Sequence, residues 1–300
     1  MKVAVIGANG QLGSDLCRVL AVQEAEVIPL LHRDLDVADP EQVNRVLDAA
    51  RPDVVISTAA YHKVDECEVQ PERSFAVNAI GPTHLARACR RLDALLVHFS
   101  TDYVFGSSQR RPYVETDAPA PLSVYGTSKA AGEFLVPNYC SRYFVIRTCG
   151  LYGLAGSAGK GGNFVETMLK KAAARESIRV VNDQVATPTF TADVAEVVSR
   201  MISPEIAGRA DASGLYHVTN EGECSWYEFA RKIFELEGLD VDLKPVSTPE
   251  IFSPVQRPAY SVLSKRKLNG LGLTMPRWEE ALARYLAARR ARVQPAATPA

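Results

Sequence analysis

Two residues four positions apart, Tyr125 and Lys129, could together carry out acid–base chemistry. If a helix begins here, as the small residues at 126–128 and 130–132 allow, the phenol and the ammonium group lie on one helix face. A phenol is a poor acid near neutrality, with a reference pKa of about 10, but a nearby cation favours the phenolate. Tyr125 would then be a proton donor, and Lys129 would lower the pKa of its phenol.

The spacing alone does not separate a catalytic pair from an ordinary one. Tyr143, Tyr227 and Tyr285 each have an arginine four residues further on, as solvated helix faces often do. The pair at 125 and 129 is therefore open to both interpretations. The strands and helices predicted around the pair must decide between a catalytic and an ordinary role.

The composition narrows the class of protein. The chain has 300 residues, with 34 basic and 35 acidic side chains and a formal net charge of -1. This balance favours neither nucleic acid nor an anionic membrane as a partner, and the length allows two lobes. The N-terminus lacks the basic and apolar regions of a signal peptide, and no apolar stretch approaches the ~20 residues of a membrane span. We expect a cytoplasmic protein.

The cysteines are spread along the chain without a Cys-x-x-Cys motif, and the histidines are not clustered. This pattern is typical of reduced thiols that fill the core, and it predicts neither a disulfide framework nor a metal site. The six positions are Cys17, Cys67, Cys89, Cys140, Cys149 and Cys224.

The N-terminal residues have the pattern of a dinucleotide-binding turn. An apolar run at 3–6 is followed by glycines at 7, 10 and 13, and then by apolar residues at helical spacing. This order predicts a strand, a glycine turn and a helix whose N-terminal amides meet a pyrophosphate. The predicted cofactor contacts here are Gly7, Gly10, Gln11 and Leu12.

The end of the second predicted strand, 26–31, bears on the choice of cofactor. In a dinucleotide fold this position meets the adenosine ribose, where an arginine favours a 2'-phosphate and an acid favours a free hydroxyl. Arg33 favours NADPH, Asp34 keeps NADH open, and Asp36 and Val37 complete the predicted contacts. Arg33 could equally be a surface residue.

Two further strands are predicted to end near the ligand. Small residues after the third strand, in Ala59-Ala60-Tyr61, leave room for a cofactor, although a tight turn would also use them. The fourth strand, 95–99, leads to Ser100, Thr101 and Asp102. A hydroxyl here could polarise a substrate carbonyl beside Tyr125, or it could cap a turn.

The alternation of strands and helices predicts an α/β protein with a Rossmann-type, doubly wound parallel sheet and a smaller, interleaved α/β substrate lobe. Residues 1–148 would form the NAD(P)-binding domain, rejoined by about 186–215. Segments 149–185 and 216–288 would form the substrate lobe, and the Arg-, Ala- and Pro-rich residues 289–300 a disordered tail.

Two helices in this scheme carry local signals. Residues 72–92 should form a long helix that Gly81-Pro82 bends. Ser225 and Glu228 form a capping box that predicts a helix start.

Taken together, the motifs at 7–13, 100–105 and 125–129 resemble the extended short-chain dehydrogenase/reductases. Within that superfamily the chain is most similar to the dTDP-4-dehydrorhamnose reductase family, over nearly all of residues 1–286. Further segments that resemble this family are 51–53, 59–61, 64–65, 115–117, 121–126, 163–164, 182–184, 188–189, 214–217 and 257–258.

The resemblance implies an activity: NAD(P)H-dependent reduction of the 4-keto group of dTDP-4-dehydro-6-deoxy-L-mannose to dTDP-L-rhamnose, or of a closely related nucleotide-activated 4-keto sugar. Tyr125 would give the proton. Lys129 would bind the nicotinamide ribose and lower the pKa of Tyr125. Thr101 would hydrogen-bond the sugar near its carbonyl, with Asp102 beside it.

Substrate diphosphate needs hydrogen-bond donors and positive charge. Arg257, followed by Pro258, is the predicted diphosphate ligand, and Asn163 is a second substrate-binding residue. Arg257 could instead be a charge on a surface loop.

One position departs from the family. Gly150 stands where the family commonly has a tryptophan that contacts the sugar, so the exact hexose is open. The glycine-rich loop 153–162 could fill the gap or act as a lid. Some family members are described with magnesium at a dimer contact, but this sequence has no acidic cluster that could be assigned to it, and we predict no metal.

Two other functions fit the same motifs. A sugar-nucleotide epimerase or dehydratase of this superfamily would hold NAD⁺ tightly and recycle the hydride. A non-catalytic NADP-binding subunit is the second alternative, because the regulatory subunit of methionine adenosyltransferase is similar to this family. Whether the protein is a homodimer is also open.

Overall fold

The computed structural model describes residues 1–106, 109–155, 162–251 and 253–293. Its centre is a six-stranded sheet in the order β10-β5-β4-β3-β1-β2, with every neighbouring pair parallel. The predicted doubly wound α/β fold is confirmed, and the strand order reverses between β1 and β3, where such sheets bind ligands. The strands are β1 (Lys2–Ile6), β2 (Glu26–Leu30), β3 (Val54–Ser57), β4 (Leu95–Thr101), β5 (Tyr143–Thr148) and β10 (Gly214–His217).

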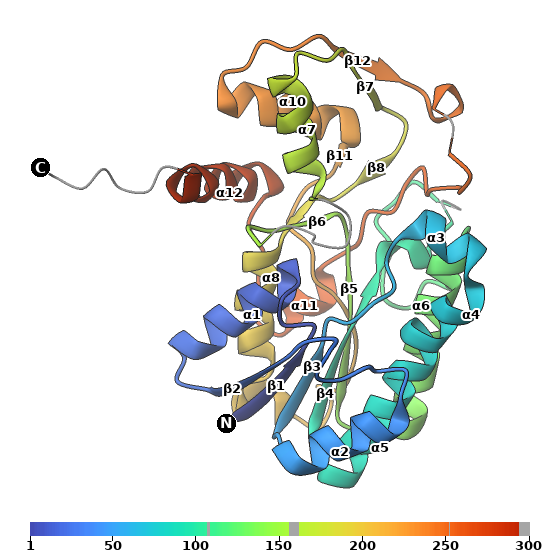
Figure 1. Ribbon diagram of the computed structural model, residues 1–300, viewed down its shortest axis with the longest axis vertical. Helices are drawn as coiled ribbons and strands as arrows, with labels where there is room; N and C mark the ends of the chain where they lie inside the picture. The colour runs from blue at the N-terminus through green and yellow to red at the C-terminus, as the bar shows by residue number, and fades with distance from the viewer. Residues whose placement is uncertain (107–108, 156–161, 252, 294–300) are drawn as a thin grey trace, which may run out of the picture.

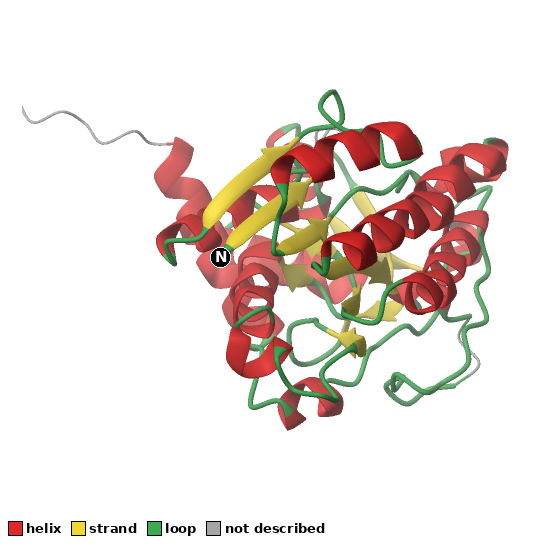
Figure 2. Ribbon diagram, turned by 90° about the horizontal axis from the view of Figure 1, so that it is seen from below, coloured by secondary structure: helices red, strands yellow, loops and turns green. Residues whose placement is uncertain are grey.

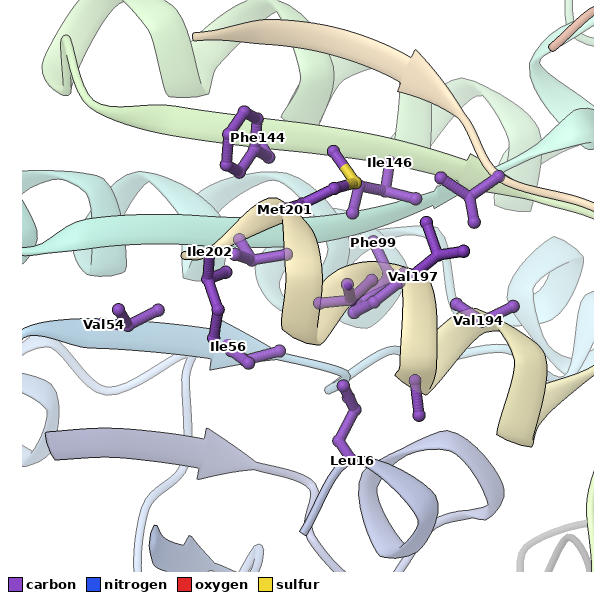
Figure 3. Packing of buried hydrophobic residues seen from close by; sticks show 14 of the residues in the cluster. Leu16, Val54, Ile56, Phe99, Phe144, Ile146, Val194, Val197, Met201 and Ile202 are labelled. Carbon is purple, nitrogen blue, oxygen red and sulfur yellow. The ribbon is translucent and has the colours of Figure 1, made fainter. Parts of the chain in front are cut away.

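Helices cover both faces of the sheet (Figures 1 and 2). On one face, α1 (Gln11–Val22) packs against α8 (Thr191–Met201), and Figure 3 shows side chains of α8 between Leu16 and the strands. The other face carries α2 (Pro40–Ala50), α5 (Gly81–Leu92) and α6 (Val124–Tyr139). Because both faces of the sheet are covered, β1 and β3 are nearly continuous Val- and Ile-rich runs, and β4 is buried along its whole length.

The predicted helix at 72–92 is irregular one turn earlier than expected. It consists of α4 (Pro71–Phe75), a π-helical segment (Ala76–Ile80) and then α5, which begins at Gly81. Pro82 has no N–H to give to the carbonyl of Asn78, which accounts for the changed hydrogen-bond pattern before it. A π segment that contains Asn78 therefore lies directly before Gly81-Pro82, where a bend is predicted.

A second layer of structure lies beyond the carboxyl ends of the strands (Figure 1). Its core is rich in aromatic side chains. The capping box of Ser225 and Glu228 is confirmed at the start of α10. The elements are β6 (Leu151–Tyr152), α7 (Phe164–Ala173), β7 (Ile178–Val181), β8 (Val185–Ala186), β9 (Thr189–Phe190), β11 (Cys224–Ser225), α10 (Trp226–Glu237), β12 (Leu243–Val246) and α12 (Trp278–Val293). Short connecting helices are α3 (Val64–Val69), α9 (Pro204–Ala207) and α11 (Arg266–Gly270).

Two segments differ from the predicted boundaries. The chain returns to the sheet at α11, because Leu268, Leu273 and Met275 pack in the same core cluster as α1 and α8. The helix α12 continues to Val293, so the disordered tail predicted from residue 289 is wrong for 289–293. Ion pairs hold the C-terminal part of α12 in place, including one of 2.7 Å between Arg289 and Glu166. Residues 294–300 lie outside the described part of the chain.

Five of the six cysteines are buried and Cys17 is partly buried, which confirms their predicted role in the core. In the part of the chain that the structure describes, no helix is long and apolar enough to cross a membrane.

Candidate active site

The glycine turn after β1 is shaped for a ligand. Gly7 has a φ of 79°, and a Cβ on Gly13 would stand 2.2 Å from the Gly7 carbonyl oxygen, so neither position accepts a side chain without a shift. Gly10 caps α1 without a side-chain hydrogen bond. The backbone amides of the first helical turn, from Gln11 and Leu12 onward, therefore have no side-chain cap, as a pyrophosphate site at a helix N-terminus requires.

Gln11 joins this turn to the second layer. Its Oε1 accepts hydrogen bonds from the Gly153 backbone at 2.9 Å and from Asn163 Nδ2 at 3.1 Å. Asn163 is buried, and its Oδ1 accepts from the Glu166 backbone at 3.0 Å to cap α7. The structure thus joins Asn163 to Gln11 after the glycine turn, and its predicted contact with substrate would require these bonds to rearrange.

The ribose end of the predicted cofactor site follows β2. The carboxylate of Asp34 accepts from the Leu31 backbone at 2.9 Å, and that of Asp36 accepts from the Ala38 backbone at 2.9 Å. The Arg33 side chain is 81% exposed. Since both acids already serve as turn acceptors, Arg33 is the side chain that can turn towards a 2'-phosphate.

Asn78 is a site residue that the sequence analysis missed. Its Oδ1 accepts from the Tyr61 backbone, and its Nδ2 donates to the Tyr61 carbonyl, both at 2.9 Å. The same Nδ2 donates to Ser128 Oγ at 3.0 Å. Asn78 therefore ties the Ala59-Ala60-Tyr61 loop to α6, one residue before Lys129. The one signal in the sequence is the proline at 82, which disturbs the helix at this point.

Tyr125 lies in the first turn of α6, as predicted. Ser123 caps this helix by accepting from the Gly126 backbone at 3.1 Å. The phenol is hydrogen-bonded to Thr101, at the carboxyl end of β4, and the ring of Tyr103 stands edge-on at 5.8 Å. Tyr125 and Thr101, which are distant in sequence, are thus brought into contact at the end of the sheet.

Two glycines let α6 approach its neighbours. A Cβ on Gly126 would lie 2.3 Å from the Tyr103 carbonyl oxygen, and one on Gly132 would lie 2.4 Å from the Asn78 carbonyl oxygen. Glycine costs about 1 kcal/mol in a helix relative to alanine. In α6 the two glycines allow the close backbone contacts that hold Tyr125 beside Thr101.

The pKa of the Tyr125 phenol is raised in the folded protein, whereas the pairing with Lys129 was expected to lower it. Burial, with smaller contributions from Asp102 and Tyr103, raises the pKa of the phenol, against the opposing Thr101 hydrogen bond. Lys129 is buried and donates to the Phe99 carbonyl at 2.5 Å. Tyr125 therefore keeps its proton near neutral pH, which is the state that a proton donor needs.

Burial also acts on Lys129 itself. It lowers the pKa of the ammonium to about 8, and the negative charge of Glu133 opposes the shift. Glu133 in turn forms a buried bidentate ion pair with Arg147 of β5, at 2.8 and 2.6 Å. Lys129 is thus held between the end of β4 and a charged pair beneath α6.

The carboxylate of Asp102 is hydrogen-bonded to other side chains of the protein. Its Oδ2 accepts from Ser261 Oγ at 2.6 Å and from Cys149 Sγ at 3.1 Å, while its Oδ1 accepts from Thr101 Oγ1 at 3.0 Å. Burial raises the pKa of this carboxyl, although the three hydrogen bonds oppose the change. In this arrangement Asp102 orients Thr101, and a direct contact with substrate would compete with these donors.

Arg257 lies beside the same site. Its guanidinium is hydrogen-bonded to Tyr103 and lies 3.2 Å from Ser253 Oγ and 3.5 Å from Asp65 of α3. Its side chain is about one-third exposed. The predicted diphosphate ligand therefore contacts Tyr103, whose ring stands edge-on to that of Tyr125.

The backbone at Gly150, where the family commonly has a tryptophan, leaves little room for a side chain. Gly150 has a φ of 53°, and a Cβ there would lie 3.2 Å from Pro188 Cα and 3.3 Å from Trp226 Cη2. Of the loop predicted to fill this gap, residues 156–161 lie outside the described residues. Within the described ranges, no group of three or more His, Cys, Asp or Glu side chains is arranged to hold a metal ion.

Comparison with known proteins places this geometry in a family. The family model described as RmlD substrate binding domain matches residues 1–291. The chain belongs to this family. It is 42% identical over 285 residues to the spore coat polysaccharide biosynthesis protein SpsK of Bacillus subtilis, covering 95% of this chain and 96% of that protein.

Two named reductases are similarly close. The dTDP-4-dehydrorhamnose reductase of Mycobacterium tuberculosis is 40% identical over 293 residues, covering 96% of this chain and 93% of that one. The crystal structure of the dTDP-4-dehydrorhamnose reductase of Bacillus anthracis in complex with NADP matches with a TM-score of 0.89 and 40% identity. That match covers 96% of this chain and 99% of the other. The expected resemblance is confirmed.

Proposed function

We propose that this protein reduces the 4-keto group of dTDP-4-dehydro-6-deoxy-L-mannose to give dTDP-L-rhamnose, with NADPH or NADH as the reductant. The observation that carries the proposal is the contact between Tyr125 and Thr101 at the carboxyl end of the parallel sheet, the edge at which the glycine turn also lies. The named reductases of the family support the substrate.

Each protein group has a role in this reaction. The nicotinamide supplies the hydride when it is bound. Tyr125 gives its phenolic proton to the alkoxide that forms at the sugar, and the raised pKa keeps that proton in place until the charge develops. Thr101 orients the phenol. Lys129 stands one helical turn away as a buried cation and binds the nicotinamide ribose.

The cofactor contacts follow the turn and the strand ends. Gly7, Gly10, Gln11 and Leu12 meet the pyrophosphate, and residues 59–61 border the cofactor on β3. Further contacts come from Asp36 and Val37. NADPH is the favoured reductant because Arg33 is exposed while both neighbouring acids are used in turns. The B. anthracis relative was crystallised with NADP.

The substrate contacts come from both layers. Arg257 meets the diphosphate, releasing Asp65, and Thr101 meets the sugar carbonyl. Asp102 and Asn163 are the other proposed substrate-binding residues, and Asp102 acts mainly by orienting Thr101. The proposed location is the cytoplasm, and a homodimer is the proposed assembly, to be tested by fractionation of cells and by the mass of the protein in solution.

A steady-state assay tests the proposal. Purified protein is given dTDP-4-dehydrorhamnose with NADPH or with NADH, and oxidation of the nicotinamide is compared with the formation of dTDP-L-rhamnose. We expect one oxidised cofactor for each product, with the higher kcat/KM for NADPH. Tightly bound NAD⁺ with no net oxidation would favour the epimerase or dehydratase alternative. Cofactor binding without turnover would favour the regulatory subunit.

A further inference from the structure

Trp226 has an unusual position for a large aromatic side chain in this protein. It is the first residue of α10, and its ring lies 4.8 Å from that of Phe164 and 6.2 Å from that of Phe229. One side of the indole thus joins the aromatic core of the second layer. The side chain is nevertheless half-buried, whereas Trp278 in the same core is buried.

The far edge of the indole lies at the end of β5. Its Cη2 atom is 3.3 Å from the point that a Cβ on Gly150 would occupy. Gly150 has a left-handed backbone, with a φ of 53°, and Pro188 crowds it from the other side. Position 150 therefore cannot present a side chain of its own without strain, and the indole is the large side chain that lies beside it.

This edge is connected to the catalytic residues through direct contacts. Cys149, the neighbour of Gly150, donates to Asp102 at 3.1 Å. Asp102 accepts from Thr101 at 3.0 Å, and Thr101 is hydrogen-bonded to Tyr125. The indole therefore lies near the ends of β4 and β5. In the sheet, β3 separates these two strands from β1, which the glycine turn follows.

The backbone that carries Trp226 is well fixed. Ser225 caps α10, and its hydroxyl also contacts Asn182 at 2.6 Å, while Glu228 closes the capping box. A rigid aromatic side chain that is only half-buried is suited to binding the C–H groups and the methyl group of a 6-deoxyhexose, because such sites combine apolar walls with a few polar groups that set orientation.

We propose that Trp226 is the aromatic wall of the sugar subsite and a specificity-determining residue of this enzyme. The inference rests on the proposed function, since it takes the occupant to be a nucleotide-activated 6-deoxyhexose. Trp226 contacts the apolar side of the sugar from the second layer. The thymidine and diphosphate groups bind elsewhere, so the contribution of Trp226 is confined to the hexose.

The first test compares two ligands that differ only in the sugar. The affinities of dTDP-L-rhamnose and of dTDP are measured for the wild type, Trp226→Ala and Trp226→Phe, with Trp278→Phe as the control. We expect Trp226→Ala to weaken dTDP-L-rhamnose binding by about tenfold or more while changing dTDP and NADPH binding by less than about twofold, and Trp226→Phe to restore most of the loss. Equal loss for dTDP and dTDP-L-rhamnose would overturn the proposal, because it would indicate a merely structural role.

Fluorescence gives a second, independent readout, because the chain has two tryptophans. In Trp278→Phe the emission comes from Trp226, and it should change on addition of dTDP-L-rhamnose more than on addition of dTDP. Should that variant not fold, the wild type is compared with Trp226→Phe, in which the sugar-dependent change should vanish. A sugar-dependent change that persists without Trp226 contradicts the proposal.

These binding measurements separate the two proposals. If the wild type binds dTDP-L-rhamnose through Trp226 but does not turn over the keto sugar, the proposed reaction fails and the sugar subsite stands. If it reduces the keto sugar while Trp226→Ala leaves KM and kcat unchanged, the reaction stands and the subsite fails. Absence of any binding of dTDP-L-rhamnose to the wild type would overturn both.

Discussion

Gly126 lies so close to the backbone of Tyr103 that a Cβ on it would stand 2.3 Å from the Tyr103 carbonyl oxygen. This contact presses the first turn of α6 against the 3₁₀ turn Asp102–Val104 that follows β4. The phenol of Tyr125 and the hydroxyl of Thr101 sit on the two backbones that meet here. Their alignment therefore depends on the absence of one methyl group.

Replacing this glycine should affect catalysis more than folding. Gly126→Ala must move α6 or the Tyr103 backbone, an overpacking that costs about 1–3 kcal/mol, and we expect kcat to fall by more than about tenfold. Gly270→Ala is the matched control, because a Cβ on this helical glycine has no neighbour within 4 Å. Turnover and the free energy of unfolding are measured for both. Unchanged kcat in Gly126→Ala would show that the contact does not position the phenol.

Removing the phenolic hydroxyl tests the proton donor. Tyr125→Phe should keep its affinity for NADPH and sugar nucleotide but lose about 10²- to 10⁴-fold in kcat, the usual contribution of a general acid. Tyr139→Phe, in the same helix but stacked under Arg87, should retain full activity. Steady-state kinetics provides the measurement. A Tyr125→Phe enzyme with near-normal rates would remove this residue from the mechanism.

The buried ammonium of Lys129 should appear in the pH dependence of stability. Its pKa in the folded protein is about 8, below its ordinary value of 10.5. Between these values the unfolded chain holds a proton that the folded chain has released. The free energy of unfolding should therefore rise with pH across this window and fall as pH drops towards 8.

Denaturant titrations of the wild type and of Lys129→Met at several pH values give the measurement. The difference between the two proteins isolates this one group, because their other titrating residues are the same. A difference that does not vary with pH between 8 and 10.5 would contradict the lowered pKa of Lys129.

The buried ion pair beneath α6 should be costly to break. Glu133→Gln leaves the guanidinium of Arg147 buried without its charge partner, and we expect a loss of about 3 kcal/mol or more in the free energy of unfolding. Asp48→Asn breaks the half-exposed pair with Arg91 and should cost at most about 1 kcal/mol. Urea denaturation compares them. Similar losses in both variants would mean that burial does not set the cost.

Local patterns were sufficient to predict much of this structure. The glycine turn, the helix that begins near Tyr125 and the capping box at Ser225 are short-range features, in which neighbouring residues determine the backbone. The alternation of strand and helix then restricts the topology, since parallel strands require crossovers. Each of these features was therefore accessible without coordinates.

Contacts between distant segments were not accessible in this way. The sequence gives no indication that Asn78 bonds Tyr61 and Ser128, or that Lys129 donates to the Phe99 carbonyl. The direction of a pKa shift depends on burial in the folded state, which no spacing reveals. The partner of Gly150, Trp226, comes from a helix more than seventy positions later.

The return of the chain to the sheet after β5 has a consequence for dissecting the protein. A fragment ending at residue 148 would lack α8, which covers Phe99 and Ile146, and would also lack the edge strand β10 (Figure 3). The truncated sheet would expose a bare apolar face and an unpaired edge, the combination that drives chains to aggregate. Neither layer can therefore be expressed alone as one continuous fragment of the chain. Insertions are better placed in surface turns such as the one after α9.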